Sequence, residues 1–411
     1  MTATSPPAGD AVAGALDAWR RGEPAAAIDT LAAAVRNGDT RALGALLQLS
    51  GQPDAPEGIE QTVYTAVEAA PASPARNRHL AFLKAAGRGC EAAPEAALAL
   101  RRRDREAGDA GATTELALLA LMAGDRELAG ALLAEAARAG SGHAIAALLR
   151  LGEESGRVAP IARQLAPALA QSGHPLAPAL IQATQALPVS KAGDGGAPDA
   201  LPDDLMSALD QAPAGGETLS ETPRIVRQAG FLPAAVCDYL AAGGAPFLQP
   251  ARIFDPETGQ SRPDPYRRSL TATLPDAAMD LVLWAIKLRM ARLSGAGFEQ
   301  GEPLSLLVYR PGEEYRAHFD FLTEDGALAS ADLARRGQRI ATSLVKLNAE
   351  YEGGATRFSR LDIAWSGGRG DALSFDNVDA EGRGDKRTLH AGEPVVAGMK
   401  VLASLWLRER P

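Results

Sequence analysis

Hydrophobic and polar positions follow two different patterns along this chain, and the pattern changes near residue 187. Before it, Ala and Leu dominate and β-branched or aromatic residues are few, which favours helices. From about Arg224, aromatic and β-branched residues increase and period-2 patterns typical of strands appear. Between them the chain is rich in Gly, Pro, Ser and Asp around one short helical stretch, LMSALD. We expect an α-helical domain at 1–186, a flexible linker at 187–223 and a β-rich domain at 224–411.

The helical part repeats itself. The segment that starts at Gly22 aligns without a gap on the one that starts at Gly124, an offset of 102 residues that places Gly38 on Gly140. This offset is three times 34, the length of a tetratricopeptide-type helix pair. Ala-rich helices also resemble one another by composition alone, but here glycine recurs at matching turns. The pattern predicts an all-α solenoid of tetratricopeptide- or Sel1-like helical repeats, a fold that usually binds peptides or proteins.

Composition and charge narrow the class of protein. From Arg224 onward the chain has 24 basic and 24 acidic residues, so the earlier part carries the whole net charge of −9. No domain is basic, and we expect no nucleic-acid partner.

The N-terminus has no signal-peptide pattern and no apolar run is long enough to span a bilayer, so no membrane association is expected. Two distant cysteines, Cys90 and Cys237, favour a reducing cytoplasm. The Ala-, Arg- and Gly-rich usage is typical of a bacterial protein.

A possible metal site follows from a histidine–carboxylate pair. LSLLVYR indicates a strand, PGEE a turn and YRAHFDF a second strand, on which Arg316, His318 and Asp320 share one face by alternation. His390 follows seventy residues after Asp320. Two histidines and one carboxylate form the facial triad of non-haem iron(II) oxygenases. An H-x-D tripeptide alone is common by chance. The other three histidines lie in the helical half without ligand spacing, and we expect them to be structural.

The last strand, MKVLASLWLRE, strengthens the case for a site. Alternation places on one face the residues Lys400, Leu402, Ser404, Trp406 and Arg408. Lys, Trp and Arg together would be unusual in a plain core, but they suit a site for an anionic ligand. The ammonium of Lys400 would pair with the distal carboxylate of a dicarboxylate cosubstrate such as 2-oxoglutarate. The alternative is an exposed amphipathic edge strand.

From Gly230 to Arg408 the chain resembles the catalytic domain of the prolyl 4-hydroxylase family. The matching stretches, in the family's order, are GFLPAAVCDYL, YRRSLTATL, EPLSLLVYRPGEEYRAHFDF, GQRIATSLVKLN, EGGATRF, GRGDALSFDN and LHAGEPVVAGMKVLASLWLR. The resemblance implies a double-stranded β-helix (jelly-roll) oxygenase domain with Fe(II) inside its mouth. It also implies 2-oxoglutarate and O2 as cosubstrates, with ascorbate as a further candidate cofactor.

The resemblance implies a functional role for each residue that matches a motif of the family. It implies that the metal ligands are His318, Asp320 and His390. The cofactor-binding candidates are Tyr309, Thr356, Lys400 and Lys346, where Lys400 and Thr356 would contact the C5 carboxylate of 2-oxoglutarate. The catalytic candidates are Tyr315 and Trp406, and the substrate-binding candidates are Glu302 and Arg339.

Three positions depart from the family pattern. Lys346 stands where the family often has a Tyr lining the cosubstrate pocket, Glu393 replaces the usual Cys, and Val401 replaces the Trp that commonly follows the Lys. None is a metal ligand, so the expected cofactors stand, whereas pocket shape and substrate choice stay open. An inward-pointing Lys346 would bring a second ammonium to the cosubstrate carboxylate. Residues 321–338 form a long strand connection, which we expect to act as a lid.

The expected activity is hydroxylation of a prolyl residue in a protein or peptide, with release of succinate and CO2. The helical repeats would help to recruit that substrate. Two alternatives remain: hydroxylation of another residue or of a small molecule on the same scaffold, and a non-catalytic peptide-binding scaffold. A zinc-bound jelly roll that hydrolyses its substrate is disfavoured because Lys400 and Thr356 would then have no purpose. The sequence leaves the oligomeric state open.

Overall fold

The computed structural model describes residues 8–52, 55–155, 167–171, 173–178, 181–182, 205–210, 215–254, 261–263, 267–323 and 327–411. The chain forms two compact units, each built from two separate stretches. The first unit contains Met1–Leu116 and Pro275–Trp284, and the second contains Ala117–Leu274 and Ala285–Pro411. This division cuts the chain at other positions than the predicted domains, whose boundaries stay predictions.

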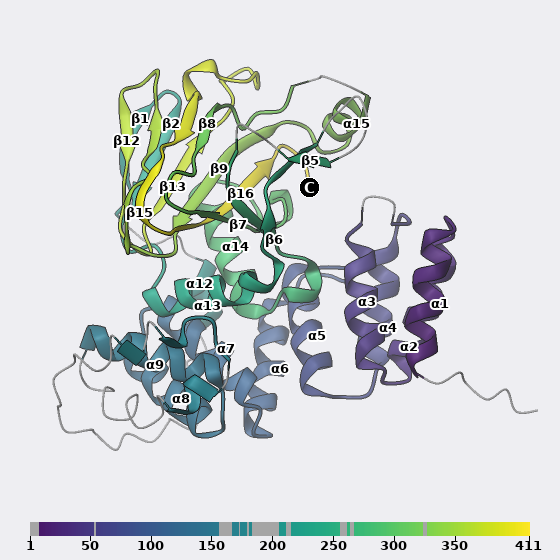
Figure 1. The fold of residues 1–411 in the computed structure, drawn as a ribbon. Coiled ribbons are helices and arrows are strands. Elements are labelled where there is room, and N and C mark those ends of the chain that lie inside the picture. Colours follow the sequence, from purple (N-terminus) through teal and green to yellow (C-terminus); the bar gives the residue numbers. More distant parts are fainter. Residues whose placement is uncertain are drawn as a thin grey trace, which may run out of the picture. The chain divides into compact units, whose positions relative to one another are not determined.

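The first unit is made of helices, and from α1 to α6 each packs on the next (Figure 1). They are α1 (Ala8–Arg20), α2 (Pro24–Arg36), α3 (Thr40–Ser50), α4 (Ile59–Ala69), α5 (Pro74–Ala86), α6 (Pro94–Glu106) and the first part of α7 (Ala110–Met122). Their contacts bury Ala, Leu, Ile and Val side chains. Polar caps define several helix starts: the Asp39 carboxylate accepts hydrogen bonds from two backbone amides of α3, and the Ser73 hydroxyl accepts one in α5.

The predicted repeat has matching helix starts. Shifting α2 and α3 by 102 residues gives the starts of α8 (Arg126–Arg138) and α9 (Gly142–Ser155). The turn glycines Gly38 and Gly140 have nearly the same left-handed φ, 89° and 92°, a conformation that glycine adopts without steric cost. The all-helical character of this region is confirmed, whereas the type of repeat stays a prediction.

The C-terminal part of the chain is antiparallel and rich in strands. One sheet has the order β1-β2-β13-β9-β16-β7-β6-β3 and another the order β12-β11-β14-β8, and two two-stranded sheets pair β10 with β15 and β4 with β5. The strands are β1 (Glu217–Glu221), β2 (Arg224–Gln228), β3 (Gln249–Pro250), β4 (Arg252–Phe254), β5 (Ser261–Pro263), β6 (Leu270–Thr273), β7 (Ser305–Tyr309), β8 (Tyr315–His318), β9 (Arg339–Lys346), β10 (Tyr351–Gly353), β11 (Thr356–Phe358), β12 (Ile363–Trp365), β13 (Ala372–Asp376), β14 (His390–Gly392), β15 (Val395–Gly398) and β16 (Lys400–Arg408). The expected jelly-roll oxygenase fold agrees with this arrangement.

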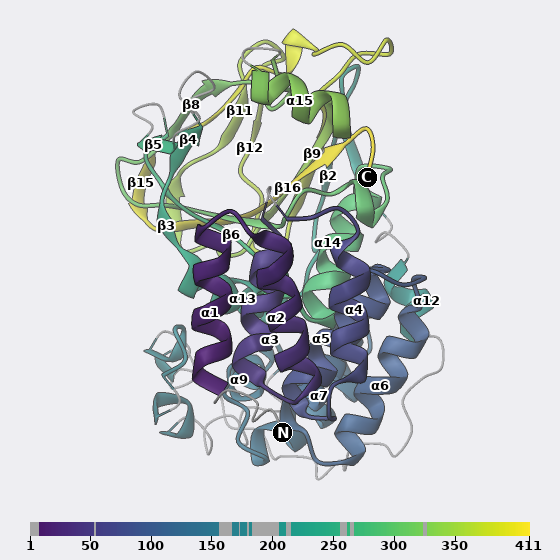
Figure 2. The same cartoon turned by 90° about the vertical axis from the view of Figure 1, so that its right-hand side faces the viewer.

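Helices and short 3-10 turns precede or connect these strands. They are α12 (Leu205–Asp210), α13 (Ala234–Gly244), α14 (Leu281–Leu293) and α15 (Ala327–Arg336), with η1 (Ala245–Phe247), η2 (Asp276–Ala278), η3 (Phe298–Gln300) and η4 (Lys386–Thr388). In the turned view of Figure 2, the strands β11 and β12 face β9 and β16. The side chains buried together with them are Ile225, Leu307, Tyr309, Leu344, Phe358, Trp365, Leu373, Phe375, Val395 and Leu402. This core forms the walls of the site described below.

The stretch predicted as a linker, 187–223, contributes a strand to the large sheet. Its segment β1 pairs with β2, and β2 pairs with β13. Sheet pairing therefore begins at Glu217, earlier than the expected start at 224. The reason is that β1, ETLSE, is an edge strand with polar, largely exposed side chains. Such a strand lacks the apolar alternation by which a strand is identified in a sequence. Most of the remaining stretch lies outside the described residues.

Both cysteines, Cys90 and Cys237, are free thiols. Within the described ranges, no helix combines the length and apolar character needed to cross a bilayer.

Candidate metal centre and cosubstrate pocket

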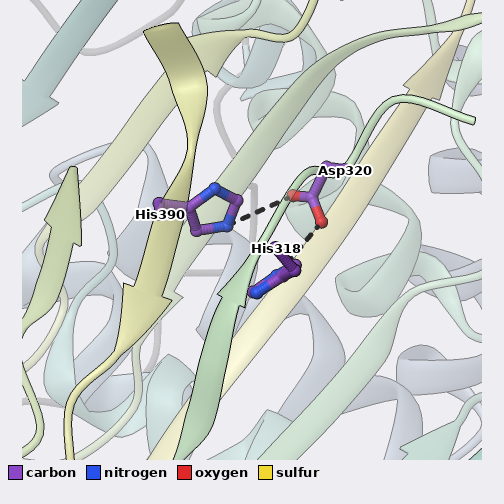
Figure 3. Close-up of side chains that lie close together, drawn as sticks. All are labelled: His318, Asp320 and His390. Carbon is purple, nitrogen blue, oxygen red and sulfur yellow. Dashed lines mark ion pairs between the residues drawn. The ribbon is translucent and has the colours of Figure 1, made fainter. Parts of the chain in front are cut away.

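The side chains of His318 and Asp320 converge with that of His390, which lies far from them in the sequence (Figure 3). His318 ends β8 and lies directly opposite His390 on β14, because these strands are neighbours in the four-stranded sheet. Asp320 follows two residues after His318. The Nε2 atom of His318 lies 3.6 Å from Oδ1 of Asp320, and Nε2 of His390 lies 3.8 Å from Oδ2. Within the described residues, these three side chains form the one group of His, Cys, Asp or Glu residues that lie close enough together to bind a metal ion.

Backbone carbonyls orient both imidazole rings. Nδ1 of His318 lies 2.8 Å from the carbonyl oxygen of Arg316, and Nδ1 of His390 lies 2.9 Å from that of Thr388. A carbonyl can only accept a hydrogen bond, so each Nδ1 must donate. In its neutral form, each ring then has its Nε2 lone pair free for a metal ion, the arrangement that metal-binding histidines usually have.

The three ligands fit a metal ion that they bind on one face of its coordination sphere. An octahedral ion with bonds of about 2.1 Å holds adjacent ligand atoms about 3 Å apart. The candidate ligand atoms of the three residues all lie within 4.8 Å of one another, so small side-chain movements would close the set around an ion. Two imidazoles and one carboxylate leave the remaining coordination positions open, as the non-haem iron(II) oxygenases require.

The protonation states suit metal binding. Burial lowers the pKa of His390 to about 4, so the ring is neutral at pH 7. Burial alone would raise the pKa of Asp320, but the imidazoles of His318 and His390 and the guanidinium of Arg339 outweigh it, so this pKa lies below its usual range. Metal ligands must be deprotonated to bind, and both groups meet that condition.

A hydrogen-bonded chain behind Asp320 positions its carboxylate. The Thr342 hydroxyl on β9 donates to Oδ2 of Asp320 at 2.7 Å, and the Asn377 side-chain amide donates to the Thr342 oxygen at 2.9 Å. All three side chains are buried. Such outer partners orient a metal ligand and typically contribute about 10- to 100-fold to metal affinity.

Thr342→Val should weaken Fe(II) binding by about 10- to 100-fold, since the isosteric side chain cannot donate to Asp320. An anaerobic Fe(II) titration measures this. Ser343→Ala is the matched control, because Ser343 is the next residue on β9 and its buried hydroxyl has no partner in the described part of the chain. Wild-type affinity in Thr342→Val would show that this hydroxyl does not position the ligand.

An irregularity in β8 brings Tyr315 to the site. His390 pairs with His318, but Gly392, two residues further, pairs with Tyr315, three residues back. The extra residue in β8 is a β-bulge, which reverses the alternation. Tyr315 therefore stacks on His318 with ring centroids 3.5 Å apart. Arg316, which strict alternation placed on the face of His318, is exposed instead.

One pocket contains most of the predicted site residues. Its lining is Leu307, Tyr309, Tyr315, His318, Asp320, Leu344, Thr356, His390, Gly392, Lys400, Leu402, Ser404 and Trp406. The predicted face of β16 is thus confirmed from Lys400 to Trp406. The free volume of this pocket is about 40 Å3.

Lys400 supplies a buried cation in this pocket. Its side chain is 1% exposed, and its ammonium donates to the carbonyl oxygen of Gly354 at 2.7 Å. Burial and the nearby charge of Lys346 lower the pKa of Lys400 to about 7, against the opposing effect of Glu393. Among the residues described, no carboxylate forms an ion pair with it. An anionic group of a ligand would satisfy this ammonium.

The lowered pKa of Lys400 predicts a pH dependence. As the pH rises above about 7, the ammonium loses its proton, so the affinity for 2-oxoglutarate should fall by roughly tenfold per pH unit. Equilibrium titrations of 2-oxoglutarate between pH 6 and 9 measure it. Lys400→Arg is the control, because a guanidinium stays charged throughout and should flatten the profile. A flat wild-type profile would contradict a titrating Lys400.

The two predicted substrate contacts, Glu302 and Arg339, pair with each other. Arg339 donates to both carboxylate oxygens of Glu302 at 2.8 and 2.7 Å, and Arg408 donates to the same carboxylate at 3.0 Å. The guanidinium of Arg339 lies 4.4 Å from the Trp406 ring centre. This network is contiguous with the pocket through Trp406, so it can fix the orientation of a pocket-lining aromatic ring.

The predicted lid, residues 321–338, contains α15. Arg408 on β16 anchors the end of this helix, since it donates to the carbonyl oxygens of Asp332 and Gly337 and pairs with the Asp332 carboxylate at 2.8 Å. Arg410 donates to two further carbonyls of the same helix end. Basic side chains commonly satisfy such free carbonyls. Opening and closing of the segment stays a prediction.

Some residues near the site were not identified from the sequence. Thr342 and Asn377 were missed because a buried Thr or Asn has no distinctive spacing. Arg267 was missed too, although its guanidinium lies 4.9 Å from the Tyr315 ring centre and its Nε and Nη2 atoms are buried without a partner in the described residues. Lys346, expected in the cosubstrate pocket, lines a different pocket.

The triad, the open coordination positions and the buried ammonium define a non-haem iron oxygenase site of the 2-oxoglutarate-using class. In agreement, the 2OG-Fe(II) oxygenase superfamily profile matches residues 304–408. Prolyl 4-hydroxylase 1 of Arabidopsis thaliana is 31% identical over 208 residues, which cover 47% of this chain and 72% of that protein. The chain belongs to the prolyl 4-hydroxylase family of the 2OG-Fe(II) oxygenases, which use Fe(II), 2-oxoglutarate and O2.

Other relatives match over a smaller share of their length. The prolyl 4-hydroxylase subunit alpha-1 of Rattus norvegicus is 35% identical over 199 residues, which cover 48% of this chain but only 37% of that protein. Among solved structures, the 2OG complex of the viral collagen prolyl hydroxylase from Paramecium Bursaria Chlorella virus-1 is 26% identical, with 45% of this chain and 95% of that chain covered and a TM-score of 0.35.

Proposed function

We propose that this protein hydroxylates a prolyl residue of a protein or peptide. The observation that carries the proposal is that the His318–Asp320–His390 triad and the buried ammonium of Lys400 line the same pocket. A metal ion at the triad and a dicarboxylate reaching Lys400 would then lie together. The names of the relatives, prolyl 4-hydroxylases, support proline as the target.

Each part of the pocket would have a distinct task. The triad would bind the iron, and Lys400 and Thr356 would bind the distal carboxylate of the cosubstrate. When bound, Fe(II), 2-oxoglutarate and O2 supply an oxidation that inserts one oxygen atom into a substrate C–H bond and releases succinate and CO2. Apolar side chains such as Leu344 and Leu402, both buried, would exclude bulk water from the reacting atoms.

The mouth of the pocket would orient the peptide. Trp406 lines the pocket and is positioned by Arg339, which Glu302 fixes in turn. Tyr315 would lie beside the reacting carbon because it stacks on a metal ligand, His318. We also propose that the helical N-terminal region helps to recruit a peptide partner and that the protein works in the cytoplasm, where its two free cysteines would stay reduced.

An anaerobic titration tests the cofactor part of this proposal. Purified protein receives Fe(II) and then 2-oxoglutarate, and the weak visible charge-transfer band of the chelate is followed. The band should appear in the wild type and be absent in His318→Ala and His390→Ala. A folded wild-type protein that forms no band would retain the fold without the chemistry, and the non-catalytic scaffold would then become the better explanation.

Peptide hydroxylation tests the substrate part. Proline-containing peptides are incubated with Fe(II), 2-oxoglutarate and O2, and mass spectrometry follows a gain of one oxygen atom together with succinate formation. We expect both products in equal amounts. Succinate formation that depends on another residue or on a small molecule, with no peptide oxidation at proline, would replace the prolyl substrate while keeping the oxygenase.

A further inference from the structure

Lys346 lies at the end of β9 and is 2% exposed, yet it does not line the pocket of the triad. Its ammonium lies 4.6 Å from the ring centre of Tyr351 and 5.5 Å from that of Trp365. Two aromatic rings offer a cation favourable contact with their faces. They do not offer a counter-ion.

A second pocket, of about 490 Å3, lies beside this ammonium, and we call it the Lys346 pocket. Its lining is Lys346, Ala349, Tyr351, Gly353, Ala355, Arg357, Ala364, Ser366, Gly367, Gly368 and Glu393. Strand β11 separates it from the triad pocket, since Arg357 lines the former and its neighbour Thr356 the latter. Successive side chains of a strand point to opposite faces, so the two pockets lie on opposite sides of the small sheet.

Two polar groups at the Lys346 pocket have no protein partner. In the described part of the chain, the ammonium of Lys346, which is not itself fully buried, makes no hydrogen bond or ion pair, and the buried hydroxyl of Tyr351 has no partner. Leaving a buried hydroxyl without a partner costs free energy. Buried polar groups without a protein partner are therefore candidates for a ligand that supplies the missing acceptor.

Nearby carboxylates do not fill this role. Asp371 accepts hydrogen bonds from the backbone amides of Gly230 and Gly368 at 2.9 and 2.7 Å. Glu393 is paired with Arg357 at the lining of the pocket. Among the described residues, neither carboxylate forms an ion pair with Lys346, although the charge of Asp371 favours the cationic form of Lys346.

The positive charges of Lys346 and Lys400 lie close enough to affect each other. Burial lowers the pKa of Lys346 to about 8 against the opposing effect of Asp371, so the side chain is still mostly cationic at pH 7. Lys346 in turn lowers the pKa of Lys400. A side-chain β-carbon at Gly354 would meet Lys400 at 3.0 Å and Tyr351 at 3.5 Å, so the Tyr351 ring lies close to the Lys400 stem.

We propose that the Lys346 pocket binds a second small anion, through a carboxylate or phosphate group that accepts hydrogen bonds from the Lys346 ammonium and the Tyr351 hydroxyl. This site is separate from the one for 2-oxoglutarate. The pocket volume suits a metabolite-sized ligand, and Arg357 and Glu393 at its lining offer polar contacts to the rest of such a molecule.

Calorimetric titration of the full-length, metal-free protein tests the proposal. The probes are inorganic phosphate and succinate, in a buffer without other multivalent anions. We expect saturable one-to-one binding of at least one probe, weakened at least tenfold in Lys346→Met and largely retained in Lys346→Arg. The better-bound probe identifies a phosphate or a carboxylate as the preferred group. Because no iron is present, the result does not depend on the proposed hydroxylation.

Further variants distinguish the two pockets. Lys400→Met should retain the binding that Lys346→Met loses, because Lys400 lines the triad pocket and is not part of the lining of the Lys346 pocket. Tyr351→Phe, which removes one hydroxyl, should weaken binding by a few-fold and provides a test if Lys346→Met does not fold. Lys287→Met is the control for loss of a buried lysine, since Lys287 is 4% exposed and also lies over an aromatic ring.

Three outcomes would overturn the second site. The first is that neither probe binds the wild-type protein in a saturable way. The second is binding that is unchanged in both Lys346→Met and Tyr351→Phe. The third is equal loss of binding in Lys346→Met and Lys400→Met, which would mean that both ammonium groups share one carboxylate in a single site.

Discussion

Asp320→Ala is expected to abolish Fe(II)-dependent turnover of 2-oxoglutarate, with a loss of at least about 100-fold. Loss of an outer partner of a metal ligand already costs about 10- to 100-fold in affinity or activity, and this change removes the ligand itself. The carboxylate is the one anionic member of the triad, so the two imidazoles would be left to bind the ion. Succinate formation and the charge-transfer band of the Fe(II) chelate measure the effect.

The fold should survive this change, because apolar strands on both sides already specify the sheets. Thermal unfolding and circular dichroism should therefore stay close to those of the wild type. Asp320→Asn tests the charge alone, since the amide retains the shape and can still accept the hydrogen bond from Thr342. Glu381→Gln, at an exposed loop position, is the surface control. Turnover at the wild-type rate in Asp320→Ala would disprove the triad.

Lys400→Met should raise the 2-oxoglutarate concentration needed for half-maximal binding by at least about 30-fold. Removing one partner of a buried charge pair typically costs about 2 kcal/mol or more, which corresponds to this factor. The remaining binding would come from the metal and from Thr356, which lines the same pocket. Titration of the Fe(II)-loaded protein with 2-oxoglutarate, without O2, measures it.

Measuring Fe(II) affinity separately distinguishes a loss of 2-oxoglutarate binding from a loss of metal binding. Fe(II) affinity in the absence of cosubstrate should be unchanged in Lys400→Met, because Lys400 contacts no triad residue through a described hydrogen bond or ion pair. Lys400→Arg should recover part of the affinity. An unchanged 2-oxoglutarate requirement in Lys400→Met would instead indicate that Lys346 pairs with the cosubstrate carboxylate.

The sequence predicted the chemically decisive parts of the site because they depend on local patterns. The period-2 pattern of β16 predicted that Lys400 and Trp406 share one face, and both line the pocket. The H-x-D motif and His390 predicted the ligand group that the structure brings together. The glycines at matching turns, Gly38 and Gly140, predicted turns between helices, and both adopt a left-handed φ.

Other features depend on contacts that no sequence period reveals. The bulge in β8 replaced Arg316 by Tyr315 on the face of His318, and an extra residue in one strand leaves no mark in the pattern. Glu302 and Arg339, expected to contact the substrate, neutralise each other because β9 lies beside β16 in the sheet, which also brings Arg408 to the same carboxylate.

The sequence by itself determined the ligand types, the strand faces that present them and the helical character of the N-terminal region, because alternation and composition are local properties of the chain. Only the tertiary structure decided which side chains share a pocket. Lys346 and Lys400 lie on neighbouring strands, yet Lys400 lines the triad pocket and Lys346 the second one. The physical reason is that a pocket is bounded by residues from several strands, and pairing between distant segments places those residues.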